Sequence, residues 1–287
     1  MNNSSDHFFD FSNKIYFGDC RKMKAVPDNS VQLIVTSPPY FNIKDYSLDG
    51  YQTNKNSKSE LGQIGDIQEY RQYINEMVKV WKECFRLLKP NGKLIINTPV
   101  MPMLKKDLNT HYNRHIFDIN SDIQSSIVNK TKFFLMDVYI WSRTNPSKKL
   151  MFGSYPYPRN FYAQNTTEFI TVYVKDGKPD KDISLADKAA SKLTQQEWVE
   201  YTKQIWQIPV PNKSDVAFGI HAALMPEEIV RRCVKLFTFQ NEVVLDPFAG
   251  SGTTLKVAKE LGRRYVGYEI SKSYEAVINK KLSIENA

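Results

Sequence analysis

The chain has 287 residues, of which 41% are hydrophobic and 13% aromatic. This length and composition suffice for a sizeable folded core and exclude a chain that is disordered throughout. Lysine and arginine outnumber aspartate and glutamate by 39 to 31, for a formal net charge of +8, and this balance favours a polyanionic partner such as nucleic acid.

The three cysteines, Cys20, Cys84 and Cys233, lie far apart and form no CxxC pair. A disulfide framework and a zinc site are therefore not expected, no other metal site is predicted, and a reducing compartment fits. The N-terminus lacks the basic and apolar regions of a signal peptide, and no stretch has the ~18 apolar residues of a membrane span. These features predict a soluble, cytoplasmic protein.

Apolar runs and helical repeats alternate along most of the chain. In chain order the patterns predict strands at 15–17, 31–36, 93–98, 133–142, 168–175, 243–245 and 265–268, and helices at 66–88, 195–204, 226–237, 253–261 and 274–284. The helix at 66–88 has a capping box of Asp66 and Glu69 and one apolar stripe: Tyr70, Ile74, Met77, Val78, Trp81, Phe85 and Leu88. This alternation predicts an α/β fold with a doubly wound, mostly parallel sheet.

Three polar segments interrupt the alternation. Residues 44–65 form a long polar loop, and residues 104–130 read as a surface insertion with a short helix. Residues 176–215 are charged and are interpreted as a small insert. We therefore divide the chain into two parts of one domain, 14–175 and 216–287, separated by the insert at 176–215.

The segment Leu-Asp-Pro-Phe-Ala-Gly-Ser-Gly-Thr-Thr follows a predicted strand and begins a helix. Its glycines allow a ligand to approach the backbone, and the start of the helix offers unpaired N–H groups. A tight strand-to-helix turn without a ligand is the alternative. Glu269 ends the next strand roughly 20 residues after the first glycine, where an acidic residue can bind ribose hydroxyls. Neither a GxGxxG motif nor a P-loop lysine is present, which disfavours NAD and ATP.

The predicted strand at 31–36 ends in the sequence Thr-Ser-Pro-Pro-Tyr, which suits a planar aromatic amine. The Ser37 hydroxyl and the Pro38 carbonyl are positioned to accept hydrogen bonds from the two N–H groups of such an amine. Proline fixes its own backbone and restricts the residue before it. Tyr40 offers a flat face on which an extruded base can stack. A Pro-Pro turn that only ends a strand is the alternative interpretation.

Together, these two loops resemble those of the DNA methyltransferases that act on exocyclic amino groups. Because the catalytic loop precedes the cofactor loop, the resemblance is to the circularly permuted beta class, and it extends from about residue 15 to the C-terminus. It implies a Rossmann-like methyltransferase sheet with a terminal β-hairpin, S-adenosyl-L-methionine as cofactor and double-stranded DNA as substrate. It also implies a restriction–modification setting, possible pairing with a cognate restriction endonuclease, and a monomer or homodimer.

The resemblance assigns residues to two groups. The catalytic group is Ser37, Pro38, Pro39 and Tyr40. The cofactor-binding group is Asp19, Cys20, Thr36, Asp246, Pro247, Phe248, Ala249, Gly250, Ser251, Gly252, Thr253, Thr254 and Glu269. Within this family serine at the first loop position is associated with cytosine N4, so that base is preferred and adenine N6 is the alternative.

Two further alternatives stay open. One is methylation of RNA or of a protein glutamine, although such relatives usually have the cofactor loop first and asparagine in place of Ser37. The other is a catalytically silent DNA-binding subunit, in which erosion of one loop is expected. We place target recognition in the insert at 176–215, with Trp206 and its lysines, together with Tyr155–Arg159. The segments 44–65 and 104–130 are the alternative places.

Overall fold

The computed structural model describes residues 10–41, 62–102, 116–145, 155–159, 163, 165–181, 183–219 and 224–284. The loop at 44–65, apart from its last residues, and the first part of the 104–130 segment lie outside these ranges. The strands are β1 (Lys14–Phe17), β2 (Val31–Thr36), β3 (Leu88–Pro99), β4 (Met101–Pro102), β5 (Ile116–Phe117), β6 (Phe133–Arg143), β7 (Thr167–Lys175), β8 (Ile205–Ile208), β9 (Val243–Asp246) and β10 (Arg264–Glu269). The α-helices are α1 (Tyr70–Leu87), α2 (Ile119–Lys130), α3 (Leu185–Ala190), α4 (Gln195–Tyr201), α5 (Glu227–Phe237), α6 (Thr253–Glu260) and α7 (Glu275–Ser283).

Eight of the described strands form one mixed sheet in the order β1-β10-β9-β2-β3-β7-β6-β8. The five strands from β1 to β3 are parallel. Strand β7 is antiparallel to both β3 and β6. The expected α/β methyltransferase fold with a mostly parallel sheet is therefore confirmed. The antiparallel pair β6–β7 is present, but β8 pairs parallel to β6, so the hairpin does not form the edge of the sheet.

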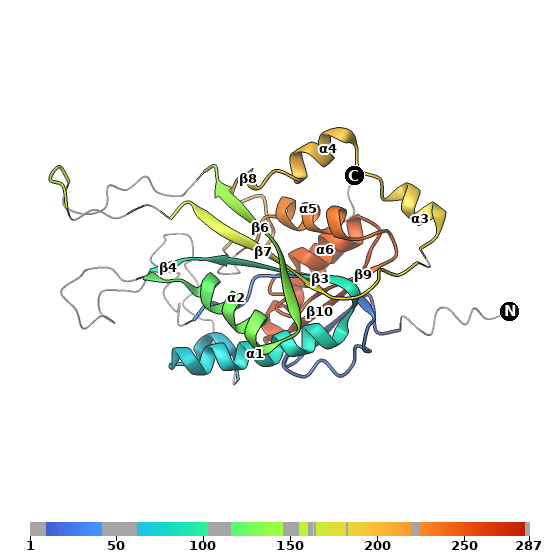
Figure 1. Cartoon of the computed structure of the whole chain (residues 1–287), viewed down its shortest axis with the longest axis horizontal. Helices are drawn as coiled ribbons and strands as arrows, with labels where there is room; N and C mark the ends of the chain where they lie inside the picture. The colour runs from blue at the N-terminus through green and yellow to red at the C-terminus, as the bar shows by residue number, and fades with distance from the viewer. Residues whose placement is uncertain are drawn as a thin grey trace.

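Helices cover both faces of the sheet, with α1 and α2 on one face and α5 and α6 on the other (Figure 1). Side chains of the central strands alternate between these layers because successive residues of a strand point to opposite faces. Ile34 packs into the core beside α1 and α2, while Leu33 and Val35 pack beside α5. Burial on both faces explains why β2 reads as a continuous apolar run in the sequence.

Helix α1 begins four residues later than the sequence predicted. Glu69 adopts an extended backbone, and its carboxylate accepts hydrogen bonds from the backbone N–H groups of Arg71 and Gln72, which makes it the N-cap. Asp66 instead ends a short 3₁₀ turn, Ile64–Asp66. The buried face is also rotated from the predicted stripe and shares only two members with it, comprising Tyr73, Met77, Val80, Trp81, Cys84 and Leu87.

Helix α2 confirms the short helix predicted within 104–130, but this helix is not a surface insertion. Ile119, Ile123 and Ile127 are at most 1% exposed and belong to the core that lies beside α1. Their spacing of four residues places them on one side of the helix. The sequence pattern did not reveal this apolar side of α2, because polar residues separate its three isoleucines.

The predicted insert at 176–215 contributes to the main fold. Its strand β8 extends the sheet, and Trp206 is fully buried against Tyr139, so the Trp206 side chain is not available to contact DNA. Helix α3 contacts the turn before β9, where Ser191 Oγ accepts a hydrogen bond from the Gln240 N–H at 2.8 Å. Strand β9 begins at this turn, so α3 lies at the amino ends of the parallel strands, on the opposite side of Figure 1 from segment 155–159.

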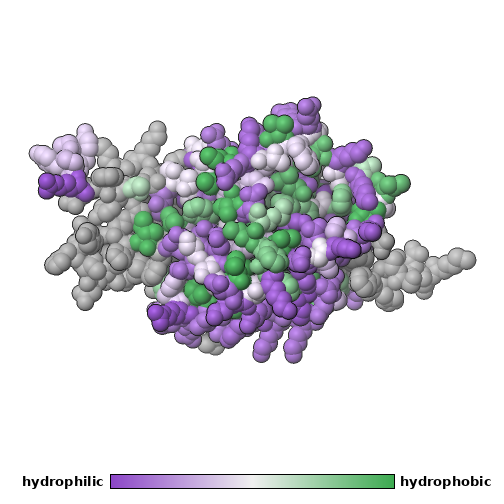
Figure 2. Space-filling view, viewed as in Figure 1, coloured by the Kyte–Doolittle hydropathy of each residue, from purple (hydrophilic) through white to green (hydrophobic). Residues whose placement is uncertain are grey.

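The surface drawn in Figure 2 is largely polar, with apolar residues interspersed among charged ones. Within the described ranges, no helix combines the length and the apolar character needed to cross a membrane.

Candidate functional site

The two loops singled out in the sequence lie side by side at the carboxyl ends of neighbouring strands. Strand β2 ends at Thr36 and is followed by Ser37, while β9 ends at Asp246 and is followed by the glycine loop. Ser37 lines a narrow cleft together with residues of the glycine loop and with Met225. Ligands of open α/β sheets bind at such carboxyl ends, so this cleft is the candidate active site.

The glycine loop adopts a backbone that other residues tolerate poorly. Gly250 and Gly252 have φ angles of 51° and 84°, in the left-handed region that glycine enters at little cost. A Cβ atom on Gly252 would also lie 3.2 Å from the Ile278 side chain. Helix α6 begins directly after Gly252 and has no side-chain N-cap. Its first N–H groups therefore carry partial positive charge toward the cleft.

The Asp246 side chain joins the two loops through hydrogen bonds. Its carboxylate, 3% exposed, accepts hydrogen bonds from the hydroxyls of Thr36 and Thr254, both at 2.7 Å, and from the Phe248 N–H at 3.0 Å. Burial raises the pKa of Asp246 to about 6, while these hydrogen bonds act in the opposite direction. The carboxylate therefore carries a charge at neutral pH directly beneath the cleft.

Glu269 ends strand β10, as the sequence predicted, and lies against the glycine loop. One of its carboxylate oxygens accepts a hydrogen bond from the Gly250 N–H at 2.8 Å, and the other accepts from the Ser271 N–H at 2.9 Å. Both oxygens thus hold backbone turns in place. The predicted contact with a ribose would have to use the remaining lone pairs of these oxygens.

Asp19 and Cys20 follow β1 at the far end of the site. Asp19 forms an ion pair with Arg21 at 2.8 Å, and Arg21 also contacts Glu76 of α1 at 2.6 Å. Burial raises the pKa of the Cys20 thiol, so this side chain is uncharged. A Cβ added to Gly18 would meet no atom of the described residues within 4 Å, so among them open space lies beside this turn.

The Ser-Pro-Pro-Tyr loop is held by two hydroxyl contacts. The oxygens of Ser37 and Tyr40 lie 2.6 Å apart in a hydrogen bond in which either can be the donor. The Tyr73 hydroxyl of α1 donates to the Pro39 carbonyl at 3.0 Å. Pro38 is buried and Tyr40 is half-buried, and burial raises the pKa of the Tyr40 phenol. Tyr40 is therefore neutral and able to exchange a hydrogen bond with Ser37.

A polar cluster beside this loop was not found from the sequence. Asn97 of β3 donates through Nδ2 to the Glu168 carboxylate at 2.7 Å, and Arg143 of β6 lies 3.4 Å from the same carboxylate. Burial raises the pKa of Glu168. Among the described residues, Asn97 Oδ1 and Arg143 Nε are buried without a hydrogen-bond partner. These three residues belong to different strands, and no local pattern connects them.

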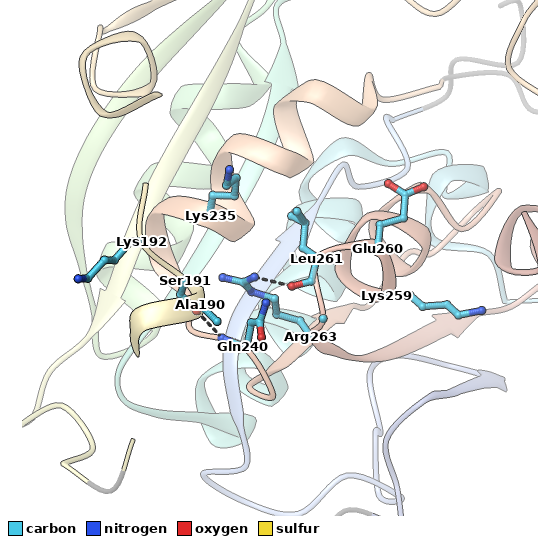
Figure 3. A pocket seen from close by; sticks show the side chains of 10 residues that line it. Ala190, Ser191, Lys192, Lys235, Gln240, Lys259, Glu260, Leu261 and Arg263 are labelled. Atoms are coloured by element: carbon cyan, nitrogen blue, oxygen red, sulfur yellow. Dashed lines mark hydrogen bonds between the residues drawn. The ribbon is translucent and has the colours of Figure 1, made fainter. Parts of the chain in front are cut away.

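A second cavity, of about 370 Å³, lies at the other end of the molecule (Figure 3). Its lining comes from the end of α3, from α5, from the turn before β9, and from the end of α6 with the turn that follows it, and includes Lys192, Lys235 and Arg263. The Arg263 guanidinium already donates hydrogen bonds to the carbonyl oxygens of Leu261 and Thr238. This cavity is larger than the cleft at Ser37, but neither predicted loop reaches it.

The fold, with two loops paired at the carboxyl ends of neighbouring parallel strands, defines an enzyme of the α/β methyltransferase class. The chain belongs to the N6/N4-methyltransferase family of DNA methylases, whose family model matches residues 31–280.

The relatives agree with this membership over nearly the whole chain. The Type II methyltransferase M.MjaI of Methanocaldococcus jannaschii is 32% identical, over 96% of this chain and 92% of the relative. The crystal structure of TTHA0409, a putative DNA modification methylase from Thermus thermophilus, superposes with a TM-score of 0.71 at 29% identity, covering 94% of each chain.

Two further structures bear on cofactor and fold. The complex of TTHA0409 with S-adenosyl-L-methionine superposes with a TM-score of 0.71 at 28% identity, over 94% of this chain and 93% of that one. The cytosine-N4-specific PvuII DNA methyltransferase has a TM-score of 0.66 at 19% identity, over 96% of this chain and 87% of that one. At this identity, the PvuII enzyme supports the shared fold alone.

Proposed function

We propose that this protein transfers a methyl group from S-adenosyl-L-methionine to the N4 amino group of cytosine in double-stranded DNA. The observation that carries this proposal is the placement of Ser37 in the same cleft as Gly250, Ser251 and Thr253. Serine at the first position of the catalytic loop favours cytosine N4 over adenine N6. The motif order, with the catalytic loop first, supports the circularly permuted class.

The donor set of the cleft fits this cofactor. The N–H groups at the start of α6, which no side chain caps, suit the carboxylate of the methionine part. Asp246 and Glu269 supply negative charge near the place where the positively charged sulfonium must lie. Open space beside Gly18 suits the adenine ring. When bound, the cofactor supplies an activated methyl group, and the protein has to position the acceptor amine.

The Ser37–Tyr40 hydrogen bond suggests how the amine is oriented. If Ser37 donates to Tyr40, both lone pairs of the Ser37 oxygen remain available to accept an N–H of the target amine. The Pro38 carbonyl is proposed to accept the other N–H. These two acceptors together draw the amine nitrogen away from planar geometry and expose its lone pair to the methyl group. Preorganised acceptors of this kind account for much of the rate of group transfer.

A cytosine inside the duplex cannot reach Ser37, so the base must be rotated out of the helix into the cleft. Tyr40 is half-buried at the cleft, and we propose that its ring supports the extruded base. The nearby cluster of Asn97, Arg143 and Glu168 lies at the carboxyl ends of β3 and β6 and at the start of β7. We propose that its polar side chains line the far side of the base pocket.

The structure narrows the segment that we propose for reading DNA. Within 176–215, helix α3 lies at the amino ends of the strands, and α4 packs on α5 through the Glu197–Lys235 ion pair. Residues 209–215 follow β8 and return to the carboxyl ends, where the backbone N–H of Val210 donates to Asn145 at 2.7 Å. We propose that DNA contacts come from this return segment and from Tyr155–Arg159, whose two tyrosines are more than 70% exposed.

The direct test is to map the modified base. Unmethylated DNA is incubated with the protein and isotope-labelled S-adenosyl-L-methionine, digested to nucleosides and analysed by mass spectrometry, with RNA as a parallel substrate. N4-methylcytosine in DNA is the expected product. N6-methyladenine would establish the alternative base, label in RNA would change the substrate class, and no label would favour a silent DNA-binding subunit.

The Type II relatives also support a restriction–modification role, with an endonuclease that cuts the same site. We propose this pairing as the biological setting, and a monomer or homodimer as the assembly. Sequencing the protected site and challenging the methylated DNA with candidate endonucleases tests the pairing.

A further inference from the structure

Helix α7 contributes a buried lysine, Lys281, that contacts two of the residues lining the cleft. Lys281 is 1% exposed, although Asn279 and Lys280, which precede it, are both exposed. It follows Val277 by four positions and Ile278 by three, and both of these residues are buried in the same helix. Lysine is almost never fully buried unless its ammonium group is paired. The partners of Lys281 therefore indicate what the buried charge does.

Three groups surround the ammonium. Lys281 Nζ donates to the Asp215 carboxylate at 3.1 Å, to Thr253 Oγ1 at 2.9 Å and to Ser251 Oγ at 3.4 Å. The Asp215 carboxylate is itself oriented by the backbone N–H of Ala217 at 2.8 Å. The single ammonium thus joins the C-terminal helix, the glycine loop and the segment that follows β8.

The direction of these hydrogen bonds is fixed by chemistry. An ammonium group has three donors and no acceptor, so the hydroxyls of Ser251 and Thr253 must accept from it. Each hydroxyl proton is then free to be donated elsewhere. Within the described part of the chain, neither hydroxyl donates to another group that the structure records. Both residues line the cleft, so the two protons are available to a ligand there.

We propose that Lys281 is a positioning residue that turns Ser251 and Thr253 into a pair of hydrogen-bond donors for the α-carboxylate of S-adenosylmethionine. This inference rests on the proposed cofactor and adds the residues that recognise its one anionic group. Thr253 is also the first residue of α6, whose uncapped N-terminus favours negative charge at the same place. The two hydroxyl donors and the N-terminus of α6 are independent features, and both favour binding of an anion at this end of the cleft.

The test compares two ligands that differ in the carboxylate alone. Binding of S-adenosylmethionine and of its decarboxylated derivative is measured by calorimetry without DNA, so the result does not depend on which base is methylated. For the wild-type protein we expect the carboxylated ligand to bind at least about tenfold more tightly. In Lys281→Met this preference should fall to about twofold or less, mainly through weaker binding of S-adenosylmethionine.

Lys280→Met is the matched control, because Lys280 is the exposed neighbour on the same helix, and it should keep the wild-type preference. An equal loss of affinity for both ligands in Lys281→Met would show a structural role and overturn the proposal. An unchanged preference would overturn it as well. Failure of the wild-type protein to bind either ligand would instead remove the cofactor assignment, and with it this proposal.

A second variant protects the test against misfolding. Thr253→Val keeps the shape of the side chain and the buried lysine but removes the hydroxyl. It should lose the preference for the carboxylated ligand, and a cooperative thermal unfolding transition without ligand should show that it folds, at a temperature lowered by the loss of one buried hydrogen bond. A folded Thr253→Val protein with full preference would contradict the proposal even if Lys281→Met does not fold.

Discussion

Thr36 and Asp246 lie 210 residues apart in the sequence and share a hydrogen bond of 2.7 Å, in which Thr36 Oγ1 donates to Asp246 Oδ1. Thr36 is the last residue of β2 and precedes Ser37, whereas Asp246 is the last residue of β9 and precedes the glycine loop. The other oxygen of Asp246 accepts from Thr254 in α6. One buried carboxylate therefore fixes the position of the glycine loop relative to the loop that begins at Ser37.

Removing the donor should destabilise the fold. In Thr36→Val the buried carboxylate loses a charge-assisted hydrogen bond while the side-chain volume is kept. We expect the free energy of unfolding to fall by about 1.5–3 kcal/mol, measured by urea denaturation at pH 7.5. Thr202→Val, at an exposed threonine, is the control and should change stability by less than about 0.5 kcal/mol. Equal stability of Thr36→Val and the wild type would contradict this role of the hydrogen bond.

Cofactor affinity should depend on pH through Asp246. Burial raises its pKa from the ordinary 3.8 to about 6, so the carboxylate is protonated below that pH and no longer attracts the sulfonium. We expect affinity for S-adenosylmethionine to weaken by up to about tenfold for each pH unit below the pKa of the free protein, until the lower pKa of the complex is reached. Calorimetry between pH 5 and pH 8 measures this dependence, and Asp246→Asn should remove it.

Acid unfolding does not explain that loss of affinity. An acid with a raised pKa in the folded state binds more protons there than in the unfolded chain. Its contribution to stability is therefore greatest at low pH and is lost as the pH rises from about 4 to about 6. Affinity and this stability contribution thus change in opposite directions, and thermal unfolding of the ligand-free protein over the same pH range separates them.

Turnover should depend on the Ser37 hydroxyl more than cofactor affinity does. Ser37→Ala removes an acceptor of the target amine, and we expect methyl transfer to slow by roughly a hundredfold under saturating cofactor. Tyr40→Phe keeps the ring but removes the hydroxyl that contacts Ser37 at 2.6 Å, and a loss of about tenfold is expected. Radiolabelled methyl transfer measures both. Wild-type turnover in Ser37→Ala would assign the loop a purely structural role.

Substitutions of basic residues at the two ends of the parallel strands should affect DNA binding differently. Arg159→Gln, at the carboxyl-end side, should weaken binding to duplex DNA by several-fold and make the affinity less dependent on salt. Lys188→Gln and Lys192→Gln remove exposed charges near α3, at the amino ends of the strands, and should leave affinity nearly unchanged. Fluorescence anisotropy at several salt concentrations checks this. The reverse result would place DNA on the α3 side.

Local patterns were sufficient to predict most elements and both loops. Strand β2 spans Val31–Thr36 as its apolar run predicted, because a strand buried on both faces must be apolar throughout. The glycine loop and the start of α6 at Thr253 were equally clear, since a turn with positive φ angles followed by a helix leaves its mark in adjacent residues. The local structure of the glycine loop and of the Ser37–Tyr40 loop could therefore be predicted without tertiary information.

Only the tertiary structure decided which side chains meet. The sequence predicted Asp19 as a cofactor-binding residue, but it did not show that this side chain pairs with Arg21, which also contacts Glu76. It also left β8 unassigned, because a four-residue strand forms only where a partner edge such as β6 is available.

Lys281 and Asp215 lie 66 residues apart, and no spacing rule joins them. Helical periodicity did place Lys281 on the apolar side of α7, together with Val277 and Ile278. Periodicity alone, however, cannot tell a lysine that reaches solvent from one whose charge is paired inside. The sequence determined the position and local structure of the two loops because each is continuous in the chain. Their alignment, and the buried charges beneath them, depended on contacts between segments that come together only when the sheet is complete.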